Sequence, residues 1–247
     1  MLTRIAASLR NRFGNSVPSR QPIPLPPGEL RMGGRHFKDD EAFVRSATED
    51  VRRLNEFGLQ KDSRLLDWGC GAGRLAVGVR ERWGRIGLYH GVDVQKRLID
   101  WAEENLTAPG FTFSFVDIAN ARYNKRGAQD HSIPGATGDY DAFYAYSVFS
   151  HMLSAEARPY LAEIRRLLSD NGFAFFTAFV EDSVVDEAEN PEGYGPMEWR
   201  GPLHCVRFER SFFDTMVTEA GLTIDRFEHG NETDGQSMYV VRPAGQR

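Results

Sequence analysis

A glycine-rich stretch, LLDWGCGAGRLA at residues 65–76, decides the fold class of this chain. Three glycines lie within five positions directly after a short apolar run, a pattern typical of a strand that turns tightly into a helix. From Gly71 onward the stretch satisfies G-x-G-x-x-A, a loop that holds the pyrophosphate of a dinucleotide. From Asp67 onward it is an acidic residue followed by G-x-G-x-G. The two patterns favour different ligands, one with a pyrophosphate and one without.

Strands and helices alternate along most of the chain. Apolar runs predict strands at residues 64–67, 87–92, 111–116, 140–146, 172–180, 222–228 and 237–241. Helical patterns lie at residues 40–57, 74–82 and 95–106, in a segment that ends near Leu168, and at 211–220, where Ser211 is placed to cap the helix. This alternation predicts an α/β fold: a doubly wound, Rossmann-like, mostly parallel seven-stranded sheet with a C-terminal antiparallel hairpin.

The N-terminal part differs in pattern, so we expect an extension at residues 1–38 and a single domain at residues 39–247. Residues 2–13 place apolar side chains at helical spacing among arginines, which favours either a frayed terminus or weak contact with a membrane surface. Five prolines between Pro18 and Pro27 follow. They predict an extended segment, either a linker or a strap over the domain.

Composition excludes several classes of function. The formal net charge of −5 argues against a nucleic-acid-binding protein, because phosphate binding needs a concentrated basic surface. Two cysteines are too few for a disulfide framework, and we therefore expect a cytoplasmic protein. The sequence holds no apolar run of the ~20 residues that a membrane span needs, and we expect no cleaved signal peptide.

Asp67 favours a ligand without phosphate. A carboxylate beside a pyrophosphate would repel it, whereas S-adenosylmethionine offers an ammonium and a sulfonium group. Asp93 ends the second predicted strand, where a carboxylate accepts hydrogen bonds from ribose hydroxyls. Asp117 follows the third strand, where it can accept from the adenine amino group while Ile118 packs on the ring. Acidic residues at the ends of three successive strands therefore predict an S-adenosylmethionine site.

With these residues, the chain over about residues 39–247 resembles a class I S-adenosylmethionine-dependent methyltransferase. The resemblance implies a methionine-binding end at the glycine loop, a ribose-binding Asp93 and an adenine-binding pair after the third strand. The cofactor-binding residues it implies are Asp67, Gly69, Cys70, Gly71, Gly73, Asp93, Val94, Asp117, Ile118 and Tyr146. In related enzymes an N-terminal piece often covers the cofactor, a role that "RMGGRHF" at residues 31–37 could fill with Gly33 and Gly34 as its hinge.

The segment after the fourth strand, AYSVFSHM at residues 145–152, lines the methyl-transfer site in such enzymes. It lacks the Pro-Pro clamp of base-modifying amino-methyltransferases, and neither Cys70 nor Cys205 has the setting of a carbon-5 nucleophile. A small molecule with an oxygen or nitrogen acceptor remains. The "SVFSH" segment makes His151 the first candidate for a general base and His204 the second. The alternative is that each histidine only supports its neighbouring segment.

Residues 181–201 follow the fifth strand and are expected to form a lid over the acceptor. Tyr194 and Trp199 there, with Tyr123 in the loop after the third strand, are the predicted substrate residues. Glu181 and Asp182 could hold Mg²⁺, although no metal motif supports this and a solvated acidic face is the favoured interpretation of them. We expect methyl transfer to a hydroxyl, with a sugar or glycolipid as the first choice. An N-methyltransferase whose acidic lid holds a cationic amine, or a non-catalytic cofactor-binding scaffold, are the alternatives.

Overall fold

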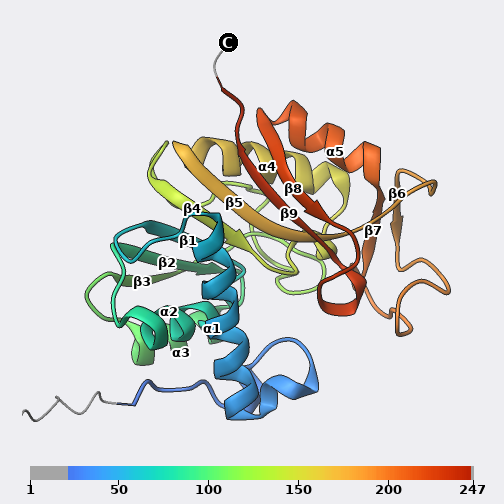
Figure 1. Ribbon diagram of the computed structural model, residues 1–247. Helices are drawn as coiled ribbons and strands as arrows, with labels where there is room; N and C mark the ends of the chain where they lie inside the picture. The colour runs from blue at the N-terminus through green and yellow to red at the C-terminus, as the bar shows by residue number, and fades with distance from the viewer. Residues whose placement is uncertain (1–21, 246–247) are drawn as a thin grey trace, which may run out of the picture.

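A central, mostly parallel sheet organises the molecule, which is a computed structural model described here over residues 22–245 (Figure 1). Strands β3, β2, β1, β4 and β5 lie side by side in that order and are all parallel. Strand β9 pairs antiparallel with β5 on one side and with β8 on the other. These strands are β1 (Arg64–Trp68), β2 (Leu88–Asp93), β3 (Phe111–Phe115), β4 (Tyr140–Ala145), β5 (Leu168–Glu181), β8 (Leu222–Glu228) and β9 (Ser237–Pro243). The predicted Rossmann-like sheet with its antiparallel C-terminal hairpin is confirmed.

Helices cover both faces of the sheet (Figure 1). Helices α1 (Asp40–Phe57), α2 (Arg74–Trp83) and α3 (Lys96–Leu106) pack on one face, and α4 (Ser154–Leu167) and α5 (Arg210–Glu219) pack on the other. Strand β1 shows why both layers form: Leu65 faces the first layer and Leu66 faces the second, and both are fully buried. Alternating burial of this kind is expected of a parallel strand covered on both sides.

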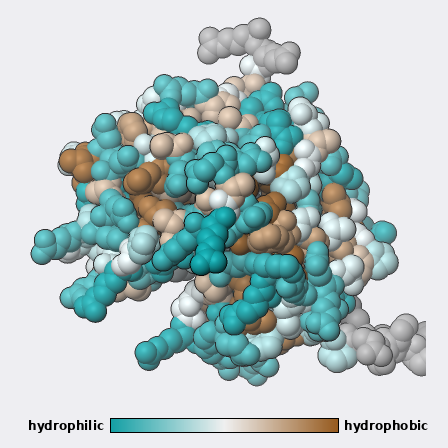
Figure 2. Space-filling view, turned by 180° about the vertical axis from the view of Figure 1, so that it is seen from behind, coloured by the Kyte–Doolittle hydropathy of each residue, from teal (hydrophilic) through white to brown (hydrophobic). Residues whose placement is uncertain are grey.

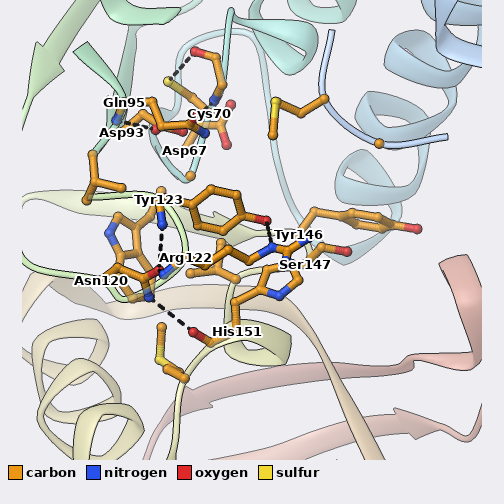
Figure 3. Close-up of a pocket in the computed structure, with 18 of the residues that line it drawn as sticks. Asp67, Cys70, Asp93, Gln95, Asn120, Arg122, Tyr123, Tyr146, Ser147 and His151 are labelled. Atoms are coloured by element: carbon orange, nitrogen blue, oxygen red, sulfur yellow. Dashed lines mark hydrogen bonds between the residues drawn. The ribbon is translucent and has the colours of Figure 1, made fainter. Parts of the chain in front are cut away.

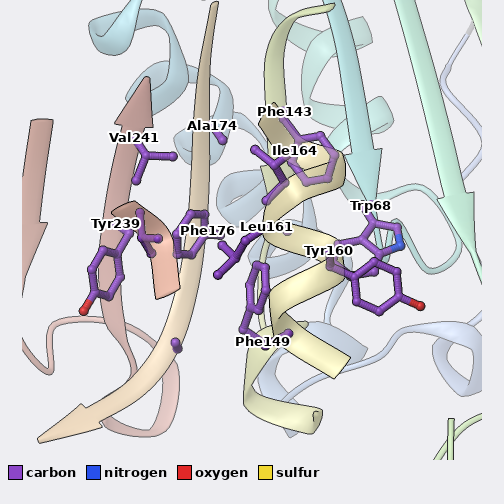
Figure 4. Close-up of a cluster of buried hydrophobic side chains, with 14 of the residues drawn as sticks. Trp68, Phe143, Phe149, Tyr160, Leu161, Ile164, Ala174, Phe176, Tyr239 and Val241 are labelled. Carbon is purple, nitrogen blue, oxygen red and sulfur yellow. The ribbon is translucent and has the colours of Figure 1, made fainter. Parts of the chain in front are cut away.

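Aromatic side chains fill the core between the sheet and α4 (Figure 4). Trp68, at the end of β1, packs against Tyr160 of α4 with ring centroids 4.3 Å apart and the ring planes tilted by 45°. Phe176 of β5 stacks on Tyr239 of β9 with centroids 5.3 Å apart. These contacts lock the strand ends against the helices, and therefore hold the loops that follow β1 and β4 in place.

The structure adds a second small hairpin that the sequence pattern did not predict. Strands β6 (Glu187–Glu189) and β7 (Val206–Glu209) pair antiparallel, and β7 runs parallel to the last three residues of β5. The sheet therefore has nine strands rather than the seven expected. Strand β6 is only three residues long and mostly charged, so it has no local strand signal.

The predicted helix cap at Ser211 is wrong by two residues. Helix α5 begins at Arg210, and the side chain of Glu209 accepts from the backbone N–H of Phe212 at 2.8 Å. The hydroxyl of Ser211 instead donates to the Glu209 carboxylate at 2.6 Å. The cap lies at Glu209 because that residue ends β7, a strand that no sequence pattern predicts.

The described part of the extension lies on the domain as a strap. Ile23 and Leu25 pack against the core beneath α1, and Leu30 contacts Ala72 and Leu98. Arg31 is buried, and its guanidinium donates to the carbonyls of Pro26 and Phe37 and pairs with Asp40. The described part of the proline-rich stretch, residues 22–27, thus packs on the domain as a strap would, whereas the amphipathic pattern at residues 2–13 lies outside the described residues.

One face of the molecule is mostly polar. Figure 2 shows one face as mostly hydrophilic, with apolar residues in small scattered groups. Between residues 22 and 245, none of the helices combines the length and the apolar character needed to span a bilayer.

Candidate functional site

One cavity of about 650 Å³ opens at the carboxyl ends of the parallel strands, the expected place for a ligand in a doubly wound sheet (Figure 3). Its volume is in the range of small-molecule sites. Five segments line it: the strap, the glycine loop after β1, the turn after β2, the loop after β3 and the segment after β4. Further parts of the wall come from Phe179 of β5, from Trp199 and His204 in the chain between β6 and β7, from the first half of α4 and from residues 233–236 between β8 and β9. Residues from very different parts of the sequence therefore face one space.

The glycine-loop end of the cavity is acidic. Asp67 is 3% exposed, and its carboxylate accepts a hydrogen bond from the hydroxyl of Tyr89. Burial raises the pKa of Asp67 to about 7. The hydrogen bond from Tyr89 and the nearby charge of Arg74 oppose this rise, and the charge of Asp93 adds to it. A buried carboxyl group with a raised pKa and no cationic side chain bonded to it is suited to a positively charged ligand group and unsuited to a pyrophosphate.

Asp93 is held in a fixed orientation at the end of β2. Its two oxygens accept from the backbone N–H groups of Gly71, at 2.9 Å, and Gln95, at 2.8 Å. Each carboxylate oxygen keeps a further lone pair, so the group can still accept from ribose hydroxyls. Burial raises the pKa of Asp93, although these backbone bonds oppose the shift.

The glycines of the loop have different structural roles. Gly69 has φ +77°, and a Cβ there would lie 2.6 Å from the side chain of Val148, which follows β4. Gly73 has φ +84° and begins α2, and a Cβ there would lie 2.5 Å from Leu106 of α3. Gly69 and Gly71 line the cavity, whereas Gly73 does not and serves helix packing. Only two of the three predicted glycines therefore face the ligand space.

The segment after β4 is held in an unusual conformation. Ser147 has φ +55°, which is rare for a residue with a side chain. Its N–H donates to the hydroxyl of Thr177 at 2.8 Å, and its own hydroxyl accepts from Gln236 at 2.6 Å. The hydroxyl of Tyr146 bonds to Glu232 at 3.1 Å. These contacts tie the segment to β5 and to the link between β8 and β9, and they set the direction in which the chain continues to His151.

His151 and His204 both line the cavity, but their hydrogen bonds give them opposite tautomers. Nδ1 of His151 lies 2.9 Å from the carbonyl oxygen of Leu203, so it must carry the proton and donate. Nε2 of His151 is then a free lone pair. Nδ1 of His204 accepts from the backbone N–H of Arg200 at 3.0 Å, so its Nε2 carries the proton. In their neutral forms, His151 can accept a proton and His204 can only donate a hydrogen bond through Nε2.

Burial also keeps His151 neutral. It lowers the pKa of His151 to about 4, and the positive charge of Arg122 contributes in the same direction, against the bond to Leu203. The pKa of His204 is lowered mainly by burial as well. At physiological pH the His151 side chain is therefore in the form that can take up a proton.

The structure brings most of the predicted site residues together. Those that line the cavity are Asp67, Gly69, Cys70, Gly71, Asp93, Val94, Ile118, Tyr123, Tyr146, His151, Trp199 and His204. Asp117 and Tyr194 do not. Asp117 is exposed and accepts from the side chain of Asn124 at 3.0 Å, and the Tyr194 hydroxyl lies 3.1 Å from Glu181. Adenine binding by Ile118 remains a prediction, and Asp117 is placed as a support of the loop after β3.

The acidic residues of the expected lid face away from the cavity. Glu181 bonds to Tyr194 and to Nε2 of His229, and Glu189 accepts from the backbone N–H of Leu203 at 2.7 Å. Neither of them, nor Asp182, lines the cavity. Across residues 22–245, no group of three His, Cys, Asp or Glu side chains is placed to hold a metal ion. Glu181 and Asp182 thus gain no support as a Mg²⁺ site.

Three arginines of the cavity wall were missed from the sequence. Arg31 belongs to the strap and pairs with Asp40, and Arg74 pairs with Asp50 and donates to Ser46 at 3.0 Å. Arg122, in the loop after β3, is the third. The partners of Arg74 lie on α1, so no local pattern could predict them.

Comparison with known proteins agrees with the resemblance to methyltransferases. A family model described as a methyltransferase domain matches residues 65–172, from β1 into β5. This part of the chain is therefore similar to methyltransferase domains. The sheet, with the antiparallel β9 between β5 and β8, is the arrangement expected of class I members of this group.

Solved structures share the fold of the methyltransferase domain. A chain from the complex between the Haloferax volcanii Trm112 methyltransferase activator and a methyltransferase is 15% identical, with 86% of this chain and 95% of that chain covered and a TM-score of 0.62. Magnesium protoporphyrin IX methyltransferase from Synechocystis, with bound S-adenosylmethionine, is 14% identical over 87% and 86% at a TM-score of 0.57. The [4+2]-cyclase SpnF is 20% identical over 83% of each chain at 0.59. At these identities the likeness concerns the fold.

Proposed function

We propose that the protein is an S-adenosylmethionine-dependent methyltransferase that acts on a hydroxyl of a small molecule, with His151 as the proton acceptor. One observation carries the proposal: a single cavity joins the acidic glycine-loop end, at Asp67 and Asp93, to the free Nε2 of His151. A cation-binding end and a proton-accepting end in one space are what methyl transfer from a sulfonium to a hydroxyl requires.

The residues present fit the cofactor. Asp67 would hold the methionine ammonium, Asp93 the ribose hydroxyls, and Ile118 the face of the adenine ring. When bound, S-adenosylmethionine supplies a methyl group on a positively charged sulfur, which an acceptor oxygen takes as the carbon–sulfur bond breaks and a neutral thioether remains. The contribution of the chain is to align the acceptor and to receive its proton.

The proton that the acceptor hydroxyl loses passes to Nε2 of His151. The carbonyl of Leu203 holds the imidazole in the tautomer with this nitrogen free, and would stabilise the imidazolium that forms. His204, with a proton on its Nε2, is suited to donate to an oxygen of the acceptor. The two histidines therefore have separate roles, one as base and one as a binding group.

The pH dependence of turnover follows from the lowered pKa of His151. Because the neutral form is the active base and the pKa is about 4, we expect kcat to stay flat from pH 6 to 8 and to fall only as the pH approaches 4. An unperturbed histidine would instead produce a limb near pH 6.5. A kcat profile between pH 5 and 8 distinguishes the two. A limb near 6.5 that disappears on His151→Asn would contradict this assignment.

The amine alternative has less support. It relied on acidic residues of the lid to hold a cation, and Glu181, Asp182 and Glu189 do not line the cavity. The carboxylate of Glu156, which does line it, accepts from the backbone N–H of Leu153 at the start of α4. Asp130 and Asp234 also line the cavity, but the acidic residues at 181–189 on which the amine alternative relied do not, whereas the base required by a hydroxyl is present.

S-adenosylhomocysteine tests the cofactor assignment. At 100 times its Kd it should stabilise the native protein by about 2.7 kcal/mol, and so raise Tm by roughly 5–10 °C for a chain of this size. NAD at the same concentration should leave Tm unchanged, because its pyrophosphate would lie against Asp67. Differential scanning fluorimetry measures both.

Turnover separates an enzyme from a scaffold. A screen of hydroxylated small molecules for conversion of S-adenosylmethionine to S-adenosylhomocysteine should yield at least one acceptor. A Tm shift with NAD alone would overturn the cofactor assignment. Binding of S-adenosylhomocysteine without turnover of any acceptor would favour a non-catalytic protein, or another reaction on the same fold.

A further inference from the structure

Arg122 is a cation in the cavity wall without an acidic partner. Its Nε donates to the hydroxyl of Tyr123 at 3.2 Å, and its guanidinium carbon lies 5.5 Å from the centroid of the same ring. Over residues 22–245 no carboxylate lies within ion-pair distance of it. A half-buried guanidinium has five N–H donors, and the contact with Tyr123 uses only one.

The other arginines of the cavity are already neutralised. Arg31 pairs with Asp40, and Arg74 pairs with Asp50. The N–H groups of both arginines are used in bonds that hold the strap and α1 in place. Both side chains therefore have a structural role in the cavity wall. Arg122 differs from both because its remaining donors are available to a ligand.

Arg122 lies at the end of the cavity where the acceptor must bind. Tyr123 packs edge-on against the imidazole of His151, with ring centroids 5.3 Å apart, and Figure 3 shows Arg122, Tyr123 and His151 grouped apart from Asp67 and Asp93. The charge of Arg122 lowers the pKa values of both His151 and His204, as expected if it is close to both. The free cation is therefore next to the proposed base.

Acidic side chains near this end do not cancel that charge. The carboxylate of Asp130 accepts from the backbone N–H groups of His131 and Ser132 in its own turn, and Glu156 caps α4. Asp234 acts on His204 and raises its pKa slightly against the effect of burial. At His151 the charges of Arg122 and, to a smaller extent, His204 both lower the pKa of the imidazole, and no carboxylate is among the causes of the shift.

We propose that Arg122 binds an anionic oxygen group of the methyl acceptor, and that the acceptor is an aromatic acid rather than a neutral sugar or alcohol. The proposal rests on the function proposed above. The aromatic part follows from two rings of the cavity wall: Tyr123 contacts Arg122, and Trp199 packs edge-on against His204 with ring centroids 5.2 Å apart. A guanidinium forms two parallel hydrogen bonds to a carboxylate, and such charge-assisted bonds are about twice as strong as neutral ones.

An acidic acceptor also suits the weakness of the base. His151 holds a proton poorly beside Arg122, and a base of low proton affinity is a poor match for an alkyl hydroxyl. A phenolic hydroxyl loses its proton far more readily. A hydroxylated aromatic acid would therefore satisfy Arg122 with its carboxylate and His151 with its hydroxyl.

Matched pairs of aromatic acids and amides test the proposal by binding alone. The probes are 4-hydroxybenzoate with 4-hydroxybenzamide, and 4-hydroxycinnamate with 4-hydroxycinnamamide, titrated calorimetrically into the protein saturated with S-adenosylhomocysteine. Each amide keeps the shape of its acid and removes the charge. We expect at least one acid to bind about tenfold or more tightly than its amide, and Arg122→Gln to abolish that preference.

Two further variants make the result specific. Arg126→Gln removes the same charge from an exposed position in the same loop outside the cavity, so it should retain the preference for the acid. Arg122→Lys keeps the charge without the paired geometry and should retain part of it. If Arg122→Gln does not bind S-adenosylhomocysteine normally, Arg122→Lys is used in its place.

Three results would overturn the proposal: amides that bind as well as acids, a preference that survives Arg122→Gln, or no binding by any acid. Failure of the wild-type protein to bind S-adenosylhomocysteine is a different outcome and would reject the proposed function itself. The two failures are therefore distinguishable in the same set of titrations.

Discussion

Asp67→Asn should weaken the binding of S-adenosylhomocysteine by about 100-fold or more and, at the same time, raise the Tm of the unliganded protein. The first effect follows because removing one member of a buried charge pair costs about 2–5 kcal/mol. The ligand ammonium would lose its carboxylate in a site that is almost closed to water, since Asp67 is 3% exposed. Isothermal titration calorimetry measures the change in Kd.

The second effect has the opposite sign because the unliganded protein carries a buried carboxyl with a pKa of about 7, against an ordinary value of 3.8. Between these values the folded protein holds a proton that the unfolded chain has released, so rising pH lowers the free energy of unfolding. Asparagine removes this cost, which is roughly 2–4 kcal/mol above pH 7 at about 1.4 kcal/mol per pKa unit. The gain in Tm should therefore be larger at pH 8 than at pH 5.

Asp117→Asn is the matched control for this prediction. Both aspartates follow strands at the same edge of the sheet, but Asp117 is exposed and bonds to Asn124 rather than lining the cavity. We expect its Kd for S-adenosylhomocysteine to stay within about threefold of wild type, because an exposed hydrogen bond contributes little. Equal losses in the two variants would mean that Asp67 has no special role.

His151→Ala should lower kcat by about 100-fold while the Kd for S-adenosylhomocysteine barely changes. General base catalysis contributes about 10²–10⁴-fold, and the low pKa of His151 places this enzyme at the lower end of that range. The measurement is steady-state turnover of an acceptor found in the screen, with cofactor binding measured separately.

Two variants distinguish the loss of the proton-accepting nitrogen from the loss of the hydrogen bonds around it. His151→Asn keeps an N–H donor where Nδ1 bonds to Leu203 and removes only the free nitrogen, so it should lose activity as His151→Ala does. His204→Ala removes a donor to the acceptor and should mainly raise KM. Near-normal kcat in both His151 variants would leave alignment of the substrates as the source of catalysis.

The cofactor end of the site could be predicted from the sequence because its determinants are local. In a parallel sheet each strand delivers its last residue to the same edge, so Asp67, Asp93 and the glycines between β1 and α2 had to meet there. Gly69 and Gly71 lie at positive φ beside the cavity, as a tight strand-to-helix loop demands. Asp117 does not line the cavity, because β3 ends two residues before it and its side chain accepts from Asn124 in the following loop, so its role at the adenine stays a prediction.

The acceptor end was decided by the tertiary structure. Whether His151 can accept a proton depends on the carbonyl of Leu203, 52 positions away, and whether Arg122 is free depends on which carboxylates come near it. The acidic residues after β5 turned out to face outward, because Glu181 and Glu189 bond to Tyr194, His229 and the backbone of Leu203. The spacing of residues along a strand or loop determines the path of the backbone. For this reason the sequence by itself determined the sheet, the glycine loop and the choice of cofactor. Tautomer, charge pairing and the direction of a lid depend on hydrogen bonds between distant segments, which exist only once the chain has folded.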